Sequence, residues 1–231
     1  MTVATKTTLS KNTLDILKNF SSINSNILVK PGNVLTTISP VKNVMSEATV
    51  EETFETEFGI WDLNKFLGTV SLFDKPEFEF EDKFVRITNG NKKSEVVYYY
   101  SQPSLLTTVN KKINMPDSVV SFQLKATDFV ELQKASSVLQ LPDLTVRSDG
   151  KNIQLTVLDK SDTTTNTYSI NVGELPDGDH EFNFYFKVEN LKMISGDYNV
   201  EISEKVVSQF THTTEDLKYW VALESDSTYN G

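Results

Sequence analysis

The stretch LSKNTLDILKNFSSI, at residues 9–23, has a near copy at residues 124–138, LKATDFVELQKASSV. The two stretches align without a gap, and their apolar residues recur at helical spacing, so each predicts an amphipathic helix. Ser10 is the expected N-cap of the first helix and Thr127 that of the second. The matched positions are Leu9 with Leu124, Leu14 with Phe129, Leu17 with Leu132, Ser21 and Ser22 with Ser136 and Ser137, and Ile23 with Val138.

The repeat resumes further along each half, where FGIWDLNKFLG at residues 58–68 resembles FKVENLKMISG at residues 186–196. Each segment predicts a strand end followed by a short helix, with Asp62 or Asn190 as its N-cap. The glycine that closes each segment is the expected helix stop. The matched pairs are Phe58 with Phe186, Ile60 with Val188, Leu63 with Leu191, Phe66 with Ile194, and Gly68 with Gly196.

Short β-type runs surround these helices in both halves. Residues 26–39 and 144–159 each predict a strand, a turn and a second strand, and residues 69–73 predict a further strand. Each half therefore repeats helix, strands, short helix and strands. We expect an α+β protein of two similar domains, residues 1–110 and 119–231, joined by a pattern-poor connector at about residues 101–118.

Composition narrows the function classes. The chain of 231 residues has 38% hydrophobic residues, enough for packed cores, and it has no cysteine. That excludes disulfides, thiolate nucleophiles and cysteine-ligated zinc. No run of about 18 apolar residues predicts a membrane span. Glycine-rich phosphate loops are absent, and His180 and His212 stand in no catalytic or metal-binding pattern, so neither an enzyme nor a cofactor is predicted.

The net charge of −10 argues against nucleic acid as a partner until its distribution is considered. Acidic residues gather in the strand and loop segments, as in FEFE at residues 78–81. Lysines instead accompany each expected helix, outside its apolar stripe. If those helices share one side of the molecule, an acidic protein can present a basic surface.

Three segments together resemble the DNA polymerase sliding clamp of T-even-type bacteriophages. They are residues 9–32 (LSKNTLDILKNFSSINSNILVKPG), residues 60–72 (IWDLNKFLGTVSL) and residues 219–228 (YWVALESDST). The similarity runs in order through both halves. It implies the DNA-clamp fold, in which helices line a ring and antiparallel sheets form its outer wall. It also implies a homotrimer around double-stranded DNA that acts as a processivity factor.

The same resemblance implies site residues and partners. DNA-facing positions are Lys11, Lys18, Lys65, Lys134, Lys192 and Lys187. The partner-binding positions, on the connector and the C-terminal strand, are Leu105, Leu106, Val109, Ile113, Pro116, Val221 and Leu223. The implied partners are the C-terminal peptide of a phage DNA polymerase, an ATP-dependent clamp loader, and late-transcription sigma and coactivator proteins. The implied location is the cytoplasm of the infected bacterial host.

Two other classes stay open from the residues alone. A phage structural β-protein of the tail or capsid would also be acidic, strand-rich, duplicated and free of cysteine, although it does not predict lysines on the helices. An enzyme with a paired-carboxylate site has only the abundance of glutamate behind it.

Overall fold

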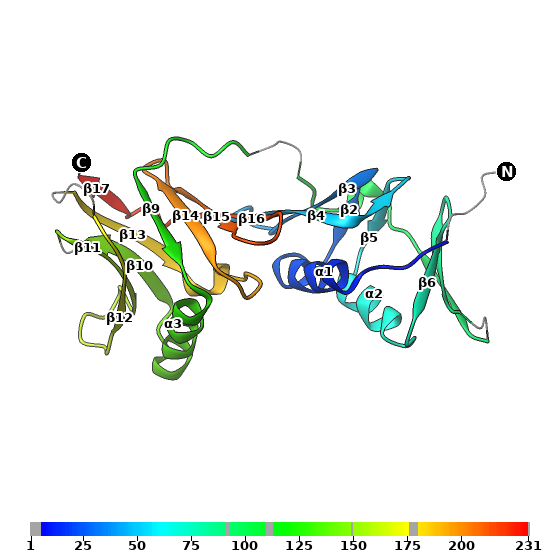
Figure 1. Ribbon diagram of the computed structural model, residues 1–231, viewed down its shortest axis with the longest axis horizontal. Helices are drawn as coiled ribbons and strands as arrows, with labels where there is room; N and C mark the ends of the chain where they lie inside the picture. Colours follow the sequence, from blue (N-terminus) through cyan, green and yellow to red (C-terminus); the bar gives the residue numbers. More distant parts are fainter. Residues whose placement is uncertain (1–5, 91–92, 110–112, 149, 176–179, 231) are drawn as a thin grey trace. The chain divides into compact units, whose positions relative to one another are not determined.

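The computed structural model of the chain describes residues 6–90, 93–109, 113–148, 150–175 and 180–230. The chain divides into two compact units, Met1–Lys112 and Ile113–Gly231. Figure 1 shows that each unit combines antiparallel strands with at least one long helix. The boundary lies inside the connector that the sequence predicts at residues 101–118.

In the first unit, helix α1 (Lys11–Ile23) packs against the short helix α2 (Leu63–Val70) and against strand β4. Ser10 caps α1 and Asp62 caps α2, each by accepting a backbone N–H three residues on, as the sequence predicts. The other elements of this unit are β1 (Lys6–Thr7), β2 (Ile27–Val29), β3 (Gly32–Ile38), β4 (Val44–Phe54), β5 (Phe58–Ile60), β6 (Pro76–Phe80), β7 (Phe84–Asn89), β8 (Glu95–Tyr99) and a 3₁₀ turn, η1 (Pro103–Leu105).

The strands of the first unit pair antiparallel throughout. One sheet has the order β1-β6-β7-β8, with β8 at its edge. β3 pairs with β4, and β2 pairs with β5 rather than with β3. The strand–turn–strand prediction for residues 26–39 is thus correct for the strands, but they do not form a hairpin with each other.

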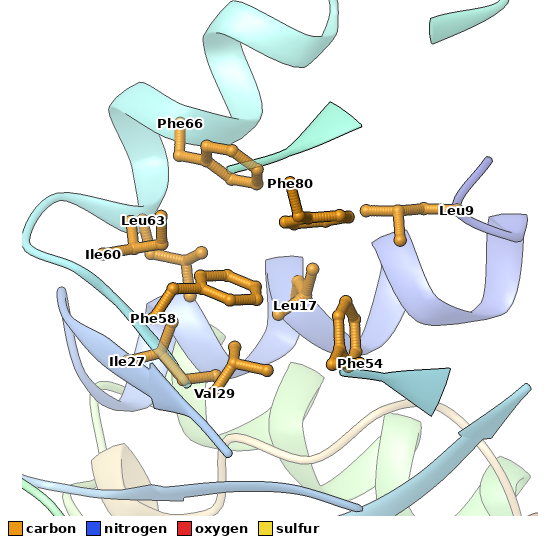
Figure 2. A pocket seen from close by; sticks show the side chains of 10 residues that line it. All are labelled: Leu9, Leu17, Ile27, Val29, Phe54, Phe58, Ile60, Leu63, Phe66 and Phe80. Carbon is orange, nitrogen blue, oxygen red and sulfur yellow. The ribbon is translucent and has the colours of Figure 1, made fainter. Parts of the chain in front are cut away.

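Apolar side chains from α1, α2 and the strands meet in the core of the first unit. The ring of Phe58 stacks on that of Tyr100 with centroids 5.1 Å apart, and it meets the ring of Phe54 edge to face at 5.6 Å. The core leaves a cavity of only about 10 Å³, shown in Figure 2, whose lining is wholly apolar. A space of that size and polarity is a packing gap and holds no ligand.

In the second unit, helix α3 (Ala126–Leu139) packs against strands β11 and β12. The other elements are β9 (Val120–Leu124), β10 (Asp143–Ser148), β11 (Asn152–Leu158), β12 (Tyr168–Glu174), β13 (Glu181–Lys187), a 3₁₀ turn η2 (Val188–Asn190), β14 (Tyr198–Ser203), β15 (Val207–His212), β16 (Leu217–Ala222) and β17 (Thr228–Asn230). β10 and β11 form the hairpin that residues 144–159 predict.

Two antiparallel arrays make up this unit. One sheet has the order β12-β11-β10-β13-β17, and the other strands run in the order β16-β15-β14-β9. Phe184, Phe186, Tyr198 and Tyr219 are among its largest fully buried side chains. The first sheet therefore ends in β12 on one side and in the short β17 on the other.

Several local predictions are wrong. Residues 186–196 form no α-helix, since only η2 spans three of them. Residues 69–73 are no strand, because α2 continues to Val70 and so runs two residues past Gly68. Thr127 does not cap α3, which begins after Lys125 without a side-chain cap of its own.

Candidate functional site

A carboxylate from a distant strand fixes the start of α1. Glu52 of β4 accepts hydrogen bonds from the backbone N–H of Ser10 and from the hydroxyl of Thr13. Thr13 is fully buried, so α1 is held against β4 at its first turn. An acceptor at this end also suits the positive end of the helix dipole.

That anchoring turns a polar face of α1 outward. Lys11, Asp15 and Lys18 are exposed, at spacings of three and four residues, while Ile16, Leu17 and Phe20 on the opposite face are buried. α1 and α2 together carry three lysines against one aspartate, a net charge of +2, within a chain of net charge −10.

Lys65 is the lysine that α2 contributes. Its side chain is exposed, and its backbone N–H donates to Asp62 over 2.9 Å. The ammonium groups of Lys11, Lys18 and Lys65 form no ion pair with any residue that the structure describes. The packing of α1 on α2 brings three uncommitted cations to one pair of neighbouring helices.

α3 presents a different face, although it repeats α1 in sequence. Lys134 is exposed, but it lies between Val130 and Val138, which are 53% and 71% exposed. Two acids accompany it, so the net charge of α3 is −1. One of them, Glu131, accepts a 3.0 Å hydrogen bond from the Tyr168 hydroxyl of β12. The exposed stripe of α3 is half apolar, which suits a protein contact better than DNA.

The start of α3 is fixed by Asp197, which precedes β14. Its carboxylate accepts the Ala126 N–H over 2.8 Å and lies 2.9 Å from the Lys125 ammonium. The hydrogen bond from Ala126, followed by that from Lys125, holds the pKa of Asp197 below its usual value.

The two remaining candidate lysines do not lie on helices. Lys187 ends β13, and its Nζ lies 2.6 Å from the carboxylate of Asp143, which is buried. Lys187 therefore neutralises a buried acid. Lys192 is exposed but follows η2 in an irregular segment, because the helix expected there does not form.

The connector candidates separate into exposed and buried groups. Leu105 is 61% exposed, whereas Leu106 is only 9% exposed. A Cβ added to Gly59 would lie 2.6 Å from Leu106 Cδ1, so Leu106 packs tightly over that glycine. Val109, Ile113 and Pro116 are half-buried.

The candidates on and after β16 are buried. Val221 is inaccessible, and its carbonyl accepts a 2.8 Å hydrogen bond from the Ser208 hydroxyl of β15. The backbone N–H of Leu223 donates to the carbonyl of Val206. Val221 is thus a core residue of the second unit, and Leu105 is the candidate most open to a partner.

Other kinds of site find no support in the described part of the chain. There, no three His, Cys, Asp or Glu side chains are grouped so that they could hold a metal ion. None of the helices described has the length and apolar character needed to cross a bilayer.

Solved structures with the same arrangement define the class of protein. Proliferating cell nuclear antigen from Entamoeba histolytica superposes with a TM-score of 0.68 at 12% identity, covering 96% of this chain and 99% of that one. The antigen from Thermococcus kodakaraensis gives 0.70 at 10% identity, covering 95% and 99%. The chain therefore has the clamp fold, α+β with antiparallel sheets, as the resemblance implies.

Sequence comparison identifies the family within that class. Residues 10–115 match the family described as DNA polymerase processivity factor, and residues 121–225 match the gp45 sliding clamp, C terminal. The sliding clamp of Vibrio phage KVP40 is 34% identical over 222 residues, covering 94% of this chain and 99% of the relative. That of Enterobacteria phage T4 is 30% identical over 230 residues, covering 96% and 99%. The chain belongs to the phage gp45-type sliding clamps, which are non-enzymatic processivity factors.

Proposed function

We propose that this sliding clamp encircles duplex DNA as a homotrimeric ring and tethers the phage DNA polymerase to it. The observation that carries the proposal is the charge of the exposed faces of α1 and α2. They are basic in an acidic chain, and Lys11, Lys18 and Lys65 are not engaged by the described residues. We assign these three lysines to the DNA-facing surface.

The chemistry of such a surface suits sliding. Duplex DNA carries about one negative charge per 1.7 Å of axis, so scattered lysines attract it without reading its sequence. Exposed ion pairs contribute on the order of 0 to 1 kcal/mol each, weak enough to exchange as the duplex moves. Retention then comes from closure of the ring, and the acidic sheets discourage contact with DNA elsewhere.

We assign less DNA contact to the second unit. Lys134 shares its stripe with two exposed valines and Lys187 is held by Asp143, so Lys134 and Lys192 are secondary contributors and Lys187 is structural. Three subunits would still place α1 and α2 three times around the duplex.

Closure of the ring needs two complementary edges on each subunit. The first unit ends in edge strand β8, with Tyr99 70% exposed, and the second ends in edge strand β12, which packs against α3. Unpaired strand edges invite pairing with another chain. We propose that β8 of one copy pairs with β12 of the next, a head-to-tail contact that can close a three-fold ring.

For the polymerase peptide we propose a site at the connector with Leu105 as its apolar contact. Val109, Ile113 and Pro116 are half-buried and can contribute. Leu106 is buried against Gly59, so it supports that surface from beneath. We assign no direct contact to Val221 and Leu223, which are buried within the second unit.

The remaining partners follow from the family. We propose that an ATP-dependent loader opens the ring, since the sequence has no nucleotide-binding motif of its own. We also propose a role as mobile activator of late transcription through sigma and coactivator proteins, in the cytoplasm of the infected host.

The test of the DNA-facing surface is a charge reversal with a matched control. Lys11, Lys18 and Lys65 are changed together to Glu. In the control, the exposed lysines Lys30, Lys75 and Lys83 of the same unit are changed to Glu, which alters the net charge equally. We expect the first variant alone to lose stimulation of the loader by DNA and processive synthesis. Equal losses in both would show that net charge, rather than this surface, governs engagement of DNA.

A further inference from the structure

The last part of the second unit lies along the edge of β13. We call residues 224–230 the strap. The backbone N–H of Glu224 donates to the Tyr185 carbonyl over 2.8 Å, and the Tyr185 N–H donates to the Ser227 hydroxyl over 3.0 Å. Beyond them β17 pairs antiparallel with β13, from Asn183 with Thr228 to Glu181 with Asn230. The strap thus occupies the open edge of the sheet as an added strand.

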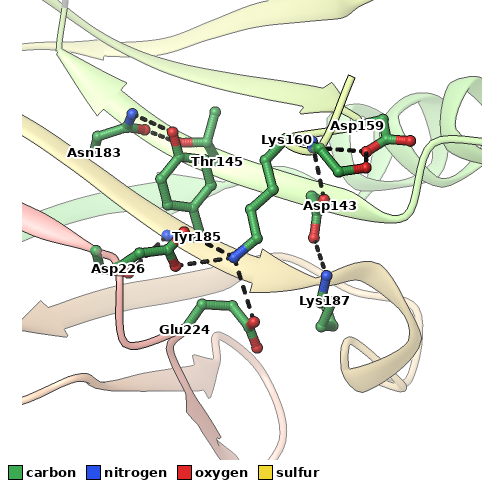
Figure 3. Close-up of polar contacts among 11 residues, drawn as sticks. Asp143, Thr145, Asp159, Lys160, Asn183, Tyr185, Lys187, Glu224 and Asp226 are labelled. Atoms are coloured by element: carbon green, nitrogen blue, oxygen red, sulfur yellow. Dashed lines mark hydrogen bonds and ion pairs between the residues drawn. The ribbon is translucent and has the colours of Figure 1, made fainter. Parts of the chain in front are cut away.

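A lysine from the loop after β11 holds the acidic end of the strap. Lys160 Nζ lies 2.9 Å from Asp226 and 3.4 Å from Glu224, and 5.2 Å from the centre of the Tyr185 ring (Figure 3). The backbone N–H of Lys160 donates to Asp143, the buried acid that Lys187 neutralises. The backbone of Lys160 is therefore anchored to the sheet, beside the carboxylates that its ammonium group holds.

An aromatic contact holds the other end. The Tyr229 ring lies 6.0 Å from the His180 ring and 6.3 Å from the Phe184 ring, stacked in both cases. The edge of β13 therefore offers the strap three kinds of contact: the Lys160 ammonium, a row of backbone groups, and the aromatic rings of His180 and Phe184. The ring that the strap places there, Tyr229, comes three residues after Asp226.

The strap is held by interactions that are easily exchanged. β17 pairs over only three residues, and Thr228 and Asn230 are exposed. The carboxylate side chain of Asp226 is 56% exposed, and ion pairs in that setting contribute little to stability. Release of the strap would leave β13 as an unpaired edge next to an unpaired lysine.

We propose that this edge is a second docking site, for an extended peptide segment of a partner protein, and that the strap competes for it. The occupant is defined by what the strap supplies: two carboxylates spaced like Glu224 and Asp226, and an aromatic residue three positions after the second. It would add to β13 as a strand. The site lies outside the connector and does not depend on the proposed polymerase contact.

The test uses the full chain with the strap released. In the variant Glu224→Lys with Asp226→Lys, the strap is repelled by Lys160 while strands β10 to β13 are unaltered. The probe is a fluorescent peptide, ESDSTYN, with the sequence of residues 224–230. We expect the peptide to bind the released variant about tenfold more tightly than the unaltered chain, where the strap competes. Addition of Lys160→Met should remove that binding, and Lys160→Arg should retain it.

Hydrogen exchange provides the second measurement. The amides of Glu224 and of β17 should exchange faster in the released variant and stay fast when the peptide is added. The Tyr185 amide of β13, which donates to Ser227, should lose protection on release and regain it when the peptide is added. Unchanged protection in the released variant would show that Lys160 does not hold the strap, which overturns the proposal. A strap that is released but no peptide binding would overturn it equally. Concentration-dependent self-association of the released variant would make the occupant a second copy and the proposed partner class wrong.

Discussion

At position 196 only glycine fits, and the reason is a tertiary contact that the local sequence does not reveal. The place of Gly196 in the repeat predicts a helix stop, but the short helix expected before it is not an α-helix, and the 3₁₀ turn η2 already ends at Asn190. A Cβ added to Gly196 would lie 2.0 Å from Nε2 of His212. The ring cannot move aside easily, since its Nδ1 accepts the backbone N–H groups of Thr214 and Glu215. Gly196 makes room for a histidine sixteen positions away.

Gly68, its partner in the repeat, is in the opposite situation, which gives a paired prediction. Gly196→Ala should destabilise the protein by about 1–3 kcal/mol, as overpacked sites do. Gly68→Ala should stabilise it by about 0.5–1 kcal/mol, because Gly68 lies inside α2 and a Cβ there meets nothing within 4 Å. Chemical denaturation of both variants measures this. A stabilised Gly68→Ala clamp that loses activity would show that the exposed face of α2 contacts a ligand.

The repeated helices show the limit of residue patterns in the same way. Leu17 and Leu132 match and are both buried, as expected. Ile23 and Val138 match in sequence too, yet Ile23 is buried and Val138 is exposed. Similar residue types predict that a helix forms, but its rotation depends on what packs beneath it. That contact partner lies far away in the sequence, so the rotation could not be predicted.

At the scale of elements, each long helix is held at its start by a carboxylate from a distant segment. Glu52 accepts a hydrogen bond from Thr13 of α1, 39 residues away in the sequence. Asp197 accepts one from Ala126 of α3, 71 residues away. Sequence patterns predicted where α1 and α2 begin, because Ser10 and Asp62 cap them locally. They placed the cap of α3 at Thr127, because a cap supplied by tertiary structure leaves no local pattern. The longest strand, β4, was missed since its buried Ala48 and Val50 alternate with glutamates that resemble a charged loop.

The Asp197 cap makes folding depend on pH in a predictable direction. Because the pKa of Asp197 is lowered in the folded state, its stabilising effect is present above the unfolded pKa, near 3.9, and is lost as pH falls through the folded value. Asp197→Asn should therefore lower the unfolding free energy at pH 7, and the difference from the unaltered protein should shrink below about pH 4. Denaturant unfolding at pH 7 and pH 3 measures both. Asp216→Asn, at an exposed acid in the turn before β16, is the control for the loss of one negative charge.

Neighbouring leucines of the connector give a second prediction at this scale. Leu105→Asp should change stability by less than about 0.5 kcal/mol, since the side chain is exposed, while weakening stimulation of the polymerase. Leu106→Asp should cost about 2 kcal/mol or more, because it buries a carboxylate against Gly59. Thermal unfolding and a processivity assay separate the two effects. Full stimulation by the Leu105→Asp clamp would remove the connector from the proposed docking site.

At the scale of the whole molecule, the duplication explains how an acidic chain can serve as a DNA clamp. Both units repeat one plan, but their helices have diverged: α1 and α2 carry a net charge of +2, whereas α3 carries −1 and exposes Val130 and Val138. The repeat was visible in the sequence and so was the fold class. The difference between the exposed faces of their helices was not visible, because it depends on which helix residues the sheets leave exposed.

Head-to-tail assembly makes a prediction that a two-fold contact does not. The unaltered protein should form a trimer of about 78 kDa, three times 26.1 kDa. Val130→Asp with Val138→Asp should disable the α3–β12 side, and Tyr99→Lys the β8 side, since each puts a charge into the proposed contact. All three positions are exposed, so each variant should fold and remain a monomer when alone. Val41→Asp, at a 77% exposed valine in the turn between β3 and β4, is the matched control and should stay trimeric.

Mixing the two disabled variants then tests the direction of the contact. Each variant keeps one intact side, and the two intact sides are complementary, so an equimolar mixture should form a heterodimer of twice 26.1 kDa and no trimer. In an isologous dimer the same patch meets itself, and mixing would restore nothing. Light scattering of the separate and mixed variants distinguishes these cases. Trimers from either variant alone would mean that β8 and the α3–β12 surface are not the ends that close the ring.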